Sequence, residues 1–215
     1  MFKKKTFILS VSLAVSLILC SAVGVLAKSG EGQIDLSGKS LSEIEAMFPM
    51  SAEEEAAIVH TIPQVSIVID DVLYEPEEIS LFDGQRLRFV VDSDGVLNAY
   101  TTVEGIERFI AEESDQLASQ DASTMGIEST SYARFYWDWH YEGSVLGLSV
   151  GAIGSLGYWN DKISSVRVDS GLWIAFMYEH INFGGDVLYC VGGSSYYELG
   201  PYGWNDRISS ISIYQ

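Results

Sequence analysis

The most constraining feature of this chain is a phrase near its end that occurs twice. Residues 159–165 read WNDKISS, and residues 204–210 read WNDRISS, 45 positions later. Each copy runs into alternating apolar residues, which is the pattern of a half-buried β-strand. A two-fold repeat of this period indicates a duplicated supersecondary unit.

A second shared pattern precedes each copy. Residues 136–143 (YWDWHYEG) and residues 178–185 (YEHINFGG) each begin with tyrosine, carry a second aromatic residue five positions later and end in glycine. We read the pattern as a folded hairpin in which the two aromatic rings pack together. Gly143 and Gly185 supply backbone freedom where a Cβ atom would clash. We therefore assign these hairpins an architectural role.

In this order, the two hairpin patterns and the two Asn-Asp-x-x-Ser-Ser loops resemble the βγ-crystallin superfamily, in its microbial calcium-binding type. The resemblance covers residues 131–215, about 40% of the chain. It implies an all-β C-terminal domain, in which two Greek keys of four strands pack as a two-sheet sandwich. Short apolar stretches broken by Gly-rich turns favour a sandwich independently of the resemblance.

The two loops are rich in the hard oxygen atoms that calcium prefers. Ca²⁺ takes six to eight oxygen ligands, and neither loop offers the sulfur or nitrogen ligands that zinc and copper prefer. The resemblance implies two Ca²⁺ ions, and the residues predicted to hold them are Asn160, Asp161, Lys162, Ser164, Asn205, Asp206, Arg207, Ser209, Trp139 and Ile181. Each site has one carboxylate, so we expect weak affinity, about 10⁻⁴ to 10⁻³ M or somewhat tighter.

In the implied arrangement, each loop holds one ion through a backbone carbonyl and a serine hydroxyl, and its aspartate reaches across to the ion of the other loop. A carbonyl from each hairpin completes the shell. The first site thus takes Lys162, Ser164, Trp139 and Asp206, and the second takes Arg207, Ser209, Ile181 and Asp161. Because only the backbone carbonyl is used at Lys162 and Arg207, their cationic side chains can point outward.

Two alternatives to calcium binding stay open. Asn-Asp is also an ordinary turn, and paired serines close strands by local hydrogen bonds, so a purely structural protein without metal fits the same residues. Some inhibitors of bacterial metalloproteases resemble this fold, which makes a secreted protease inhibitor the second hypothesis. Those inhibitors look disulfide-stapled, whereas this chain has no cysteine pair once its leader is removed.

The first 27 residues have the three parts of a secretory signal peptide. Lysines at positions 3–5 form a basic start, residues 7–19 are apolar, and Ala27 is the small residue before the cleavage point. We therefore expect residues 1–27 to be removed and the protein to be secreted. An uncleaved anchor is the alternative, because the apolar run approaches the roughly 20 residues that span a bilayer.

The cleaved chain keeps one cysteine, Cys190. It lies in the apolar run 187–191, where a buried structural thiol is the expected role. A single thiol cannot build an internal disulfide framework, so stability must come from packing or from bound metal.

The chain is strongly acidic, with a formal net charge of −18. Residues 28–130 carry 5 basic and 22 acidic residues, and residues 131–215 carry 4 and 8. Such acidity opposes binding to nucleic acid and to anionic membranes and draws cations toward the surface. That attraction is unspecific; calcium is the partner that the resemblance implies, and the sequence names no protein partner.

The first half divides into three parts before the β domain. Residues 28–61 form an acidic helical segment in which Ser40 and Ser51 each begin a capping box. Residues 62–112 alternate apolar and polar positions and then form an amphipathic helix, which predicts a small α+β module. Residues 113–130 lack periodicity and are expected to be a linker.

One turn in this module needs a choice between two interpretations. Asp92, Asp94 and Gly95 resemble the start of a calcium loop, but an EF-hand needs glycine at its sixth position and glutamate at its twelfth. Here those positions hold Leu97 and Val103. We therefore predict a β-hairpin with a two-residue type I′ turn at Asp94-Gly95.

No catalytic arrangement is evident, and we predict no enzymatic activity. The chain lacks a recognisable phosphate loop or nucleophile motif. His60, His140 and His180 lack metal-ligand spacing and an evident nucleophile or carboxylate cluster to work with. We expect all three histidines to be structural or to face solvent.

Overall fold

The computed structural model describes residues 39–120 and 131–215. The predicted signal peptide, residues 1–27, lies outside the described residues, and so do residues 121–130 of the expected linker. In the part of the chain that is described, no helix is long and apolar enough to cross a membrane.

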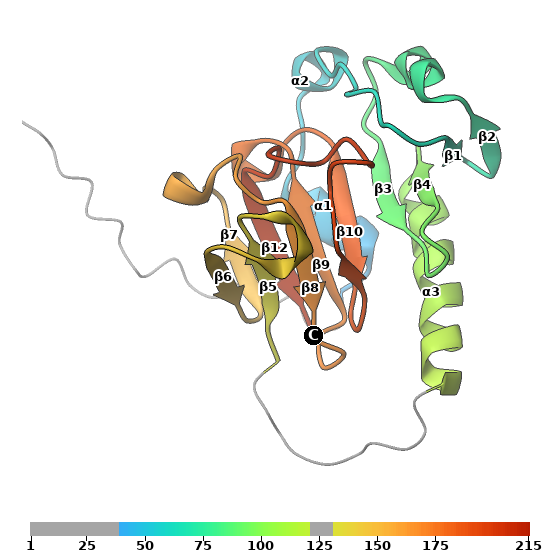
Figure 1. Cartoon of the computed structure of the whole chain (residues 1–215). Helices are drawn as coiled ribbons and strands as arrows, with labels where there is room; N and C mark the ends of the chain where they lie inside the picture. The colour runs from blue at the N-terminus through green and yellow to red at the C-terminus, as the bar shows by residue number, and fades with distance from the viewer. Residues whose placement is uncertain (1–38, 121–130) are drawn as a thin grey trace, which may run out of the picture. The chain divides into compact units, whose positions relative to one another are not determined.

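The repeated region folds as the predicted two-sheet β-sandwich (Figure 1). Its strands are β5 (Ala133–Tyr136), β6 (Val145–Leu148), β7 (Gly151–Ile153), β8 (Ser165–Val168), β9 (Ile174–Tyr178), β10 (Val187–Val191), β11 (Ser195–Tyr196) and β12 (Ser210–Tyr214). One sheet has the order β11-β8-β5-β6, and the other contains the order β10-β9-β12-β7. The third strand of each repeat crosses to the opposite sheet, because β7 pairs with β12 and β11 pairs with β8. Two interlocked Greek keys result, as the family resemblance implied.

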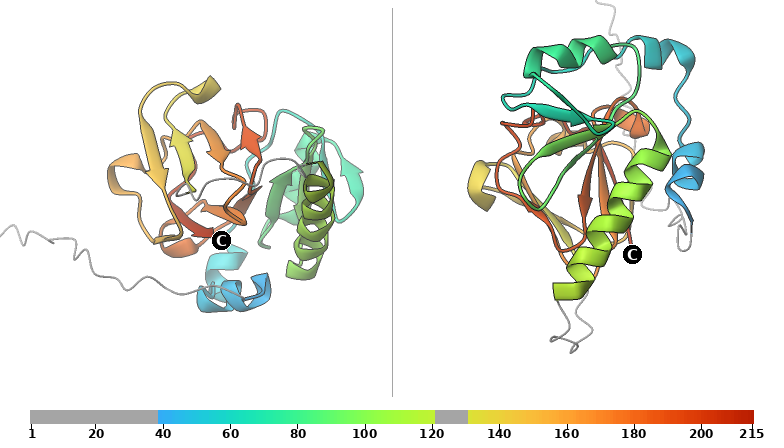
Figure 2. Two further views of the ribbon diagram at one scale, coloured as in Figure 1. Left: turned by 90° about the horizontal axis from the view of Figure 1, so that it is seen from below. Right: turned by 90° about the vertical axis from the view of Figure 1, so that its right-hand side faces the viewer.

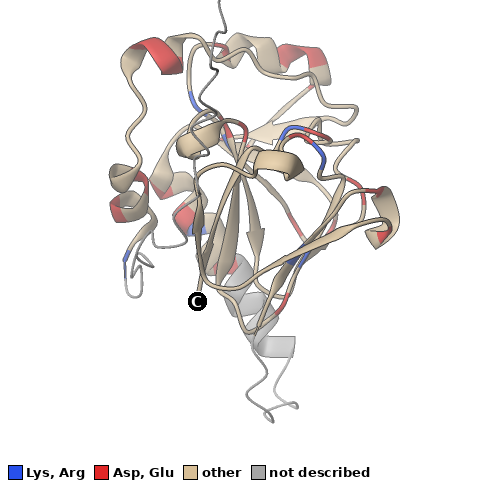
Figure 3. Cartoon of the chain, turned by 90° about the vertical axis from the view of Figure 1, so that its left-hand side faces the viewer, with Lys and Arg blue, Asp and Glu red and all other residues tan. Residues whose placement is uncertain are grey.

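The preceding region has short helices and short strands. They are α1 (Leu41–Met47), α2 (Ala52–Ala56), β1 (Ile67–Ile69), β2 (Val72–Tyr74), the 3₁₀ helix η1 (Pro76–Phe82), β3 (Arg88–Val91), β4 (Leu97–Tyr100) and α3 (Val103–Gln120). Both predicted capping boxes are present at the starts of α1 and α2. Acidic side chains mark α2 and η1 (Figure 3), and α2 buries none of its residues. We call residues 39–120 the N-terminal module.

The hairpin between β3 and β4 is present, but its turn differs from the predicted two-residue type. The last paired residues are Val91 and Leu97, and Asp92 still bonds to Val96, so residues 93–95 form the loop. The Gly95 N–H donates to the Asp92 carbonyl, the Asp92 N–H donates to the Val96 carbonyl, and Gly95 has φ +83°. This pattern is typical of a three-residue loop that ends in a left-handed glycine. Asp92 accounts for the difference, because its carboxylate accepts the Asp94 and Val96 N–H groups and so favours the wider loop.

The N-terminal module extends the larger sheet of the sandwich. Strand β3 pairs in parallel with β10, and the continuous order is β2-β1-β4-β3-β10-β9-β12-β7. Figure 2 shows β3 and β4 beside the sandwich, with α3 lying along them. Helix α3 continues to Gln120, so the segment expected as a linker at 113–130 begins as a helix.

Two apolar clusters cover the two faces of this larger sheet. The cluster between the sheets includes Phe135, Leu188 and Trp204. The other lies between the sheet and the helices, where Ile44 of α1 and Ile106 of α3 pack on the outer face. Strands β9, β10 and β12 are therefore buried at every residue and do not alternate. Cys190 belongs to the inner cluster as a buried free thiol, in the structural role predicted for it.

Candidate metal centre

Each Asn-Asp-x-x-Ser-Ser loop is a tight turn built around its aspartate. Asp161 and Asp206 adopt left-handed conformations, with φ of 53° and 55°. Asp and Asn tolerate this region better than other residues that carry a side chain. The Asn160 amide donates to Asp161 Oδ2 at 2.5 Å, and the Asn205 amide donates to Asp206 Oδ2 at 2.7 Å. The two asparagines thus orient the two carboxylates.

The two loops lie against each other and exchange backbone hydrogen bonds. The Asp161 N–H donates to the Ile208 carbonyl at 3.1 Å, and the Asp206 N–H donates to the Ile163 carbonyl at 3.2 Å. Because these two bonds are equivalent, the loops are related by the approximate two-fold symmetry of the repeat. Both loops therefore belong to one centre.

The aspartates cross between the loops. The Ser209 hydroxyl donates to Asp161 Oδ1 at 3.1 Å, and the side chain of Ser164 is hydrogen-bonded to Asp206. Each carboxylate therefore lies against the serine of the opposite loop. We call the set of Lys162, Trp139, Ser164 and Asp206 the Ser164 site, and the set of Arg207, Ile181, Ser209 and Asp161 the Ser209 site.

The second serine of each loop fastens the loop to its hairpin. Ser165 Oγ accepts from the Tyr141 N–H at 3.1 Å and donates to the Asp138 carbonyl at 2.7 Å. Ser210 Oγ accepts from the Phe183 N–H at 3.0 Å and donates to the His180 carbonyl at 2.6 Å. Both serines are fully buried. The predicted site omitted them, although their place in the repeated phrase was the signal that could have identified them.

The two hairpins share one backbone shape. Residues 140–141 and residues 182–183 are consecutive left-handed pairs, and Trp139 and Ile181 lie at equivalent tips, 52% and 54% exposed. The predicted aromatic packing is present, with ring centroids 5.5 Å apart in the first hairpin and 5.4 Å apart in the second. Gly143 and Gly185 have φ of 75° and 74°, a left-handed conformation that favours glycine at both positions.

The cationic side chains at the loop tips turn back onto their own loops. Lys162 Nζ donates to the Tyr158 carbonyl at 2.8 Å and lies 3.8 Å from the centre of the Tyr158 ring. Arg207 donates to the Gly203 carbonyl at 2.7 Å and to Glu179 Oε1 at 2.7 Å. Both cations thus reach the carbonyl four residues earlier instead of pointing outward, and Glu179 balances the charge of Arg207.

The centre is negative around Asp206. Burial, followed by the charges of Asp161 and Asp138, raises the pKa of Asp206 above 3.8, although the Ser164 hydrogen bond lowers it. Beside it lies a hollow of about 450 Å³ lined by Trp137, Asp138, Trp139, His140, Glu142, Ser164 and Asp206. A cation at this point would relieve the repulsion that raises the pKa of Asp206.

The donor set consists of oxygen atoms, with one carboxylate in each site. Within residues 39–120 and 131–215, no three side chains of the His, Cys, Asp or Glu type gather as a metal cluster. The carbonyl, hydroxyl and carboxylate oxygens of the two loops are ligands of the kind that calcium prefers.

Two histidines have carboxylate partners that the sequence did not reveal. His60 Nδ1 lies 2.8 Å from Asp186 Oδ2, and both side chains are buried. His140 Nε2 lies 2.8 Å from Glu198, and its ring stacks on Tyr197 with centroids 4.0 Å apart. The sequence showed no sign of these partners, because Asp186 and Glu198 are distant in the sequence from the two histidines and only folding brings them together.

The His60–Asp186 pair is not arranged for catalysis. His60 Nε2 faces the Phe82 carbonyl at 2.9 Å, so both ring nitrogens are engaged. A general base needs a ring nitrogen that can accept a proton from a nucleophile. This pair holds the structure together and offers no such nitrogen.

Comparison with known proteins gives one family match and several structural matches. The model of peptidase inhibitor family I36 matches residues 129–187. No match was found among curated proteins.

Several solved structures are similar to the repeated region. A βγ-crystallin from an archaeon is 27% identical over 40% of this chain and 99% of its own chain, with a TM-score of 0.35. A double mutant of a βγ-crystallin domain from Clostridium beijerinckii is 31% identical over 39% of this chain and 96% of its own, with a TM-score of 0.34. The N-terminal domain of protein S is 27% identical over 38% and 93%, with a TM-score of 0.33.

Proposed function

Because residues 131–215 form a βγ-crystallin-like sandwich, we propose that this is a secreted, non-enzymatic calcium-binding protein. In this proposal the two crossed loops hold Ca²⁺ and the ions stabilise the fold. The leader-like start of the sequence supports secretion. The proposal predicts two ions, one at the Ser164 site and one at the Ser209 site.

The crossed aspartate–serine pairs are the observation that carries this proposal. Asp161 lies against Ser209, and Asp206 against Ser164, so each carboxylate lies next to oxygen donors of the other loop. A divalent cation bound there ties the two Greek keys together. Because such an ion binds the folded chain and not the unfolded one, it raises stability by mass action.

Thermal unfolding of the full chain tests the proposal. We expect the melting temperature to rise in millimolar Ca²⁺ relative to chelator, and isothermal titration to show heat of binding. The rise should be lost in the double variant Asp161→Asn, Asp206→Asn. It should persist in Asp94→Asn, which removes a carboxylate from the β3–β4 loop, outside the two candidate sites. Equal melting temperatures of the unmodified chain with calcium and with chelator, together with no heat, would reject calcium binding.

The match to peptidase inhibitor family I36 favours a second candidate, a protease inhibitor. The absence of a disulfide among the described residues, where Cys190 is the free cysteine, separates this chain from a disulfide-stapled inhibitor. A panel of secreted proteases assayed with the purified chain distinguishes the two functions. Inhibition that survives the double aspartate variant would support the inhibitor and assign it a surface other than the metal centre.

A further inference from the structure

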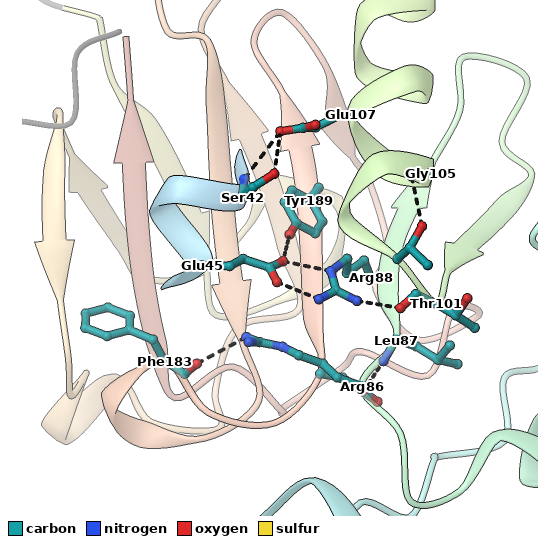
Figure 4. Close-up of polar contacts among 12 residues, drawn as sticks. Ser42, Glu45, Arg86, Leu87, Arg88, Thr101, Gly105, Glu107, Phe183 and Tyr189 are labelled. Carbon is teal, nitrogen blue, oxygen red and sulfur yellow. Dashed lines mark hydrogen bonds and ion pairs between the residues drawn. The ribbon is translucent and has the colours of Figure 1, made fainter. Parts of the chain in front are cut away.

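Two side chains of the N-terminal module rest on the hairpin between β9 and β10. Arg86 Nη2 donates to the Phe183 carbonyl at 3.2 Å (Figure 4), and its guanidinium carbon lies 5.6 Å from the centre of the Tyr178 ring. The Phe48 ring packs on Phe183 with centroids 4.2 Å apart. Because Phe183 is left-handed and lies two residues after Ile181, these contacts fix the tip of the hairpin.

A buried ion pair ties the same hairpin to the segment before β1. His60 Nδ1 lies 2.8 Å from Asp186 Oδ2, and Nε2 lies 2.9 Å from the Phe82 carbonyl oxygen. A carboxylate and a carbonyl can only accept, so both ring nitrogens donate and His60 is an imidazolium cation. The other Asp186 oxygen accepts the Leu87 N–H at 2.9 Å. The pair is therefore fully hydrogen-bonded as well as buried.

The charge of His60 depends on pH in a defined direction. Burial alone lowers its pKa, but the hydrogen bond and charge of Asp186, together with the Phe82 carbonyl and Asp83, raise the pKa above 6.5. The charged groups that face the ring are Asp186 of the hairpin and Asp83 after η1, and Phe89 of β3 lies 6.3 Å away as an edge-on ring. The stabilising contribution is complete below pH 6.5 and is lost as pH rises through the raised pKa.

The hairpin is linked in turn to the second loop. Glu179 Oε1 accepts from Arg207 Nη2 at 2.7 Å, and Glu179 Oε2 accepts the Asp186 N–H at 3.4 Å. Arg207 supplies the predicted carbonyl ligand of the Ser209 site. A continuous set of polar contacts therefore runs from the N-terminal module to that site.

The equivalent hairpin of the Ser164 site has no such support. Ser144 stands where Asp186 stands in the repeat. Among the described residues, no hydrogen bond or ion pair joins residues 136–145 to residues 39–120. The two sites thus differ in what holds their hairpins.

We propose that the N-terminal module positions the Ser209 site, with protonated His60 and Arg86 as the positioning residues. The proposal rests on calcium binding as the function. A ligand set that is held in place before binding loses less conformational freedom when the ion arrives. Support of a ligand by surrounding groups commonly changes metal affinity by about 10-fold or more. Positioning the Ser209 site is thus the role that we assign to the N-terminal module.

The test isolates each site in the full chain. Asp206→Asn leaves the Ser209 site as the competent one, and Asp161→Asn leaves the Ser164 site. Isothermal titration with CaCl₂ then compares each background with and without His60→Gln. We expect His60→Gln to weaken binding roughly 10-fold in the Asp206→Asn background and to leave the Asp161→Asn background unchanged.

The dependence of calcium affinity on pH tests the role of His60 directly, because a residue that only stabilised the fold would not change this affinity with its protonation. In the Asp206→Asn background, calcium affinity should fall as pH rises from 6.5 to 9, because His60 loses its proton. With His60→Gln, which donates a hydrogen bond but does not titrate in this range, the profile should be flat. If His60→Gln fails to fold, the Asp161→Asn background serves as the control. In the described chain no hydrogen bond or ion pair joins His60 to the Ser164 site, so the affinity of that site should not follow this profile.

Arg86→Gln provides a second route, with Arg108→Gln as its matched control. Arg108 pairs with Asp71 on the surface, away from both hairpins. Loss of affinity in Arg86→Gln but not in Arg108→Gln supports the proposal. Calcium binding that responds equally at both sites, or at neither, would overturn the positioning role while leaving calcium binding intact. No calcium binding in either background would instead reject the function on which it rests.

Discussion

The two candidate sites share one backbone and differ in the charges around it. Asp138 of the first hairpin occupies the position of His180 in the second, and Glu142 occupies the position of Gly184. The second hairpin has carboxylates of its own, Glu179 and Asp186, but Arg207 and His60 pair with them. Asp138 and Glu142 therefore leave the Ser164 site the more negative of the two, whereas the Ser209 site is the one supported by the N-terminal module. The two copies share the residues whose hydrogen bonds shape the loops. They differ at positions whose side chains make no such bonds, among them those of Asp138 and Glu142.

The outer edges of the two sheets differ in the same way. Strands β6 and β10 are equivalent in the repeat, but β10 pairs with β3 and is buried throughout. In the described chain β6 pairs with β5 alone, and its residues alternate between exposed and half-buried. Strand β10 thus lies inside a larger sheet, whereas β6 is an edge strand of the smaller sheet.

The largest expected effect is a difference in unfolding free energy between variants of the two tryptophans in the repeated phrase. Trp204 is fully buried and packs 5.5 Å from the Phe89 ring of β3, whereas Trp159 is half-buried against Trp137. Trp204→Ala should lower the free energy of unfolding by about 3–5 kcal/mol, and Trp159→Ala by clearly less. Urea denaturation of both variants measures the difference. Equal losses would show that the halves contribute alike to the core.

A smaller difference in unfolding free energy is expected between variants of the equivalent strands β10 and β6. Val187 begins β10 and is fully buried, and Val145 begins β6 and is 53% exposed. Val187→Ala should cost about 2 kcal/mol of unfolding free energy, while Val145→Ala should stay within about 0.5 kcal/mol. The same denaturation measurement decides the matter. A large loss at Val145 would mean that a partner covers the β6 edge in solution.

The sequence predicted the half of the fold that repeats and missed how the other half attaches. The repeated phrases indicated a duplicated unit, and the family resemblance that rests on them implied its two Greek keys and the crossed aspartates. The pairing of β3 with β10 has no such second copy, and it joins segments nearly 100 residues apart. Their continuous apolar runs, residues 88–91 and 187–191, were the available signal, since such runs are typical of strands buried on both faces.

The sequence names the candidate ligands, which stay a prediction, but it does not reveal the residues that support the two loops. The crossed pairs follow from the family resemblance, whereas His60 and Asp186 are 126 residues apart and neither lies in a motif. Ser165 and Ser210 are in the motif, but a serine that closes a strand and a serine that binds an ion look alike in one dimension. Their hydrogen bonds distinguish them: Ser165 and Ser210 bond to hairpin carbonyls, whereas the first serine of each loop bonds to the aspartate of the other loop.

A third prediction uses the charge difference between the sites. Asp138→Asn should weaken calcium binding at the Ser164 site several-fold, because it removes a negative charge that acts on Asp206. The effect on the Ser209 site should be small. Titration in the Asp161→Asn and Asp206→Asn backgrounds measures the two sites separately, and His140→Gln on the same hairpin controls for general disturbance. Equal weakening at both sites would contradict the charge argument.

The smallest effect concerns Asp206 in the absence of calcium. Its pKa is raised, chiefly by burial and then by Asp161 and Asp138, so the folded chain holds this proton more tightly than the unfolded chain does. The contribution of Asp206 therefore favours folding below pH 3.8 and is lost as pH rises through the raised pKa. In calcium-free buffer at pH 7, Asp206→Asn should melt slightly above the unmodified chain, and the gap should close as pH falls toward 4.

Saturating calcium should reverse the order, because the ion stabilises the ionised carboxylate and has less to bind in the variant. Melting curves of both chains at pH 4 and pH 7, with and without calcium, give all the values needed. Asparagine tolerates the left-handed backbone at this position, so the substitution isolates the charge. A variant that melts below the unmodified chain in calcium-free buffer at pH 7 would mean that Asp206 already has a partner for its charge. The centre would then have no need of a cation.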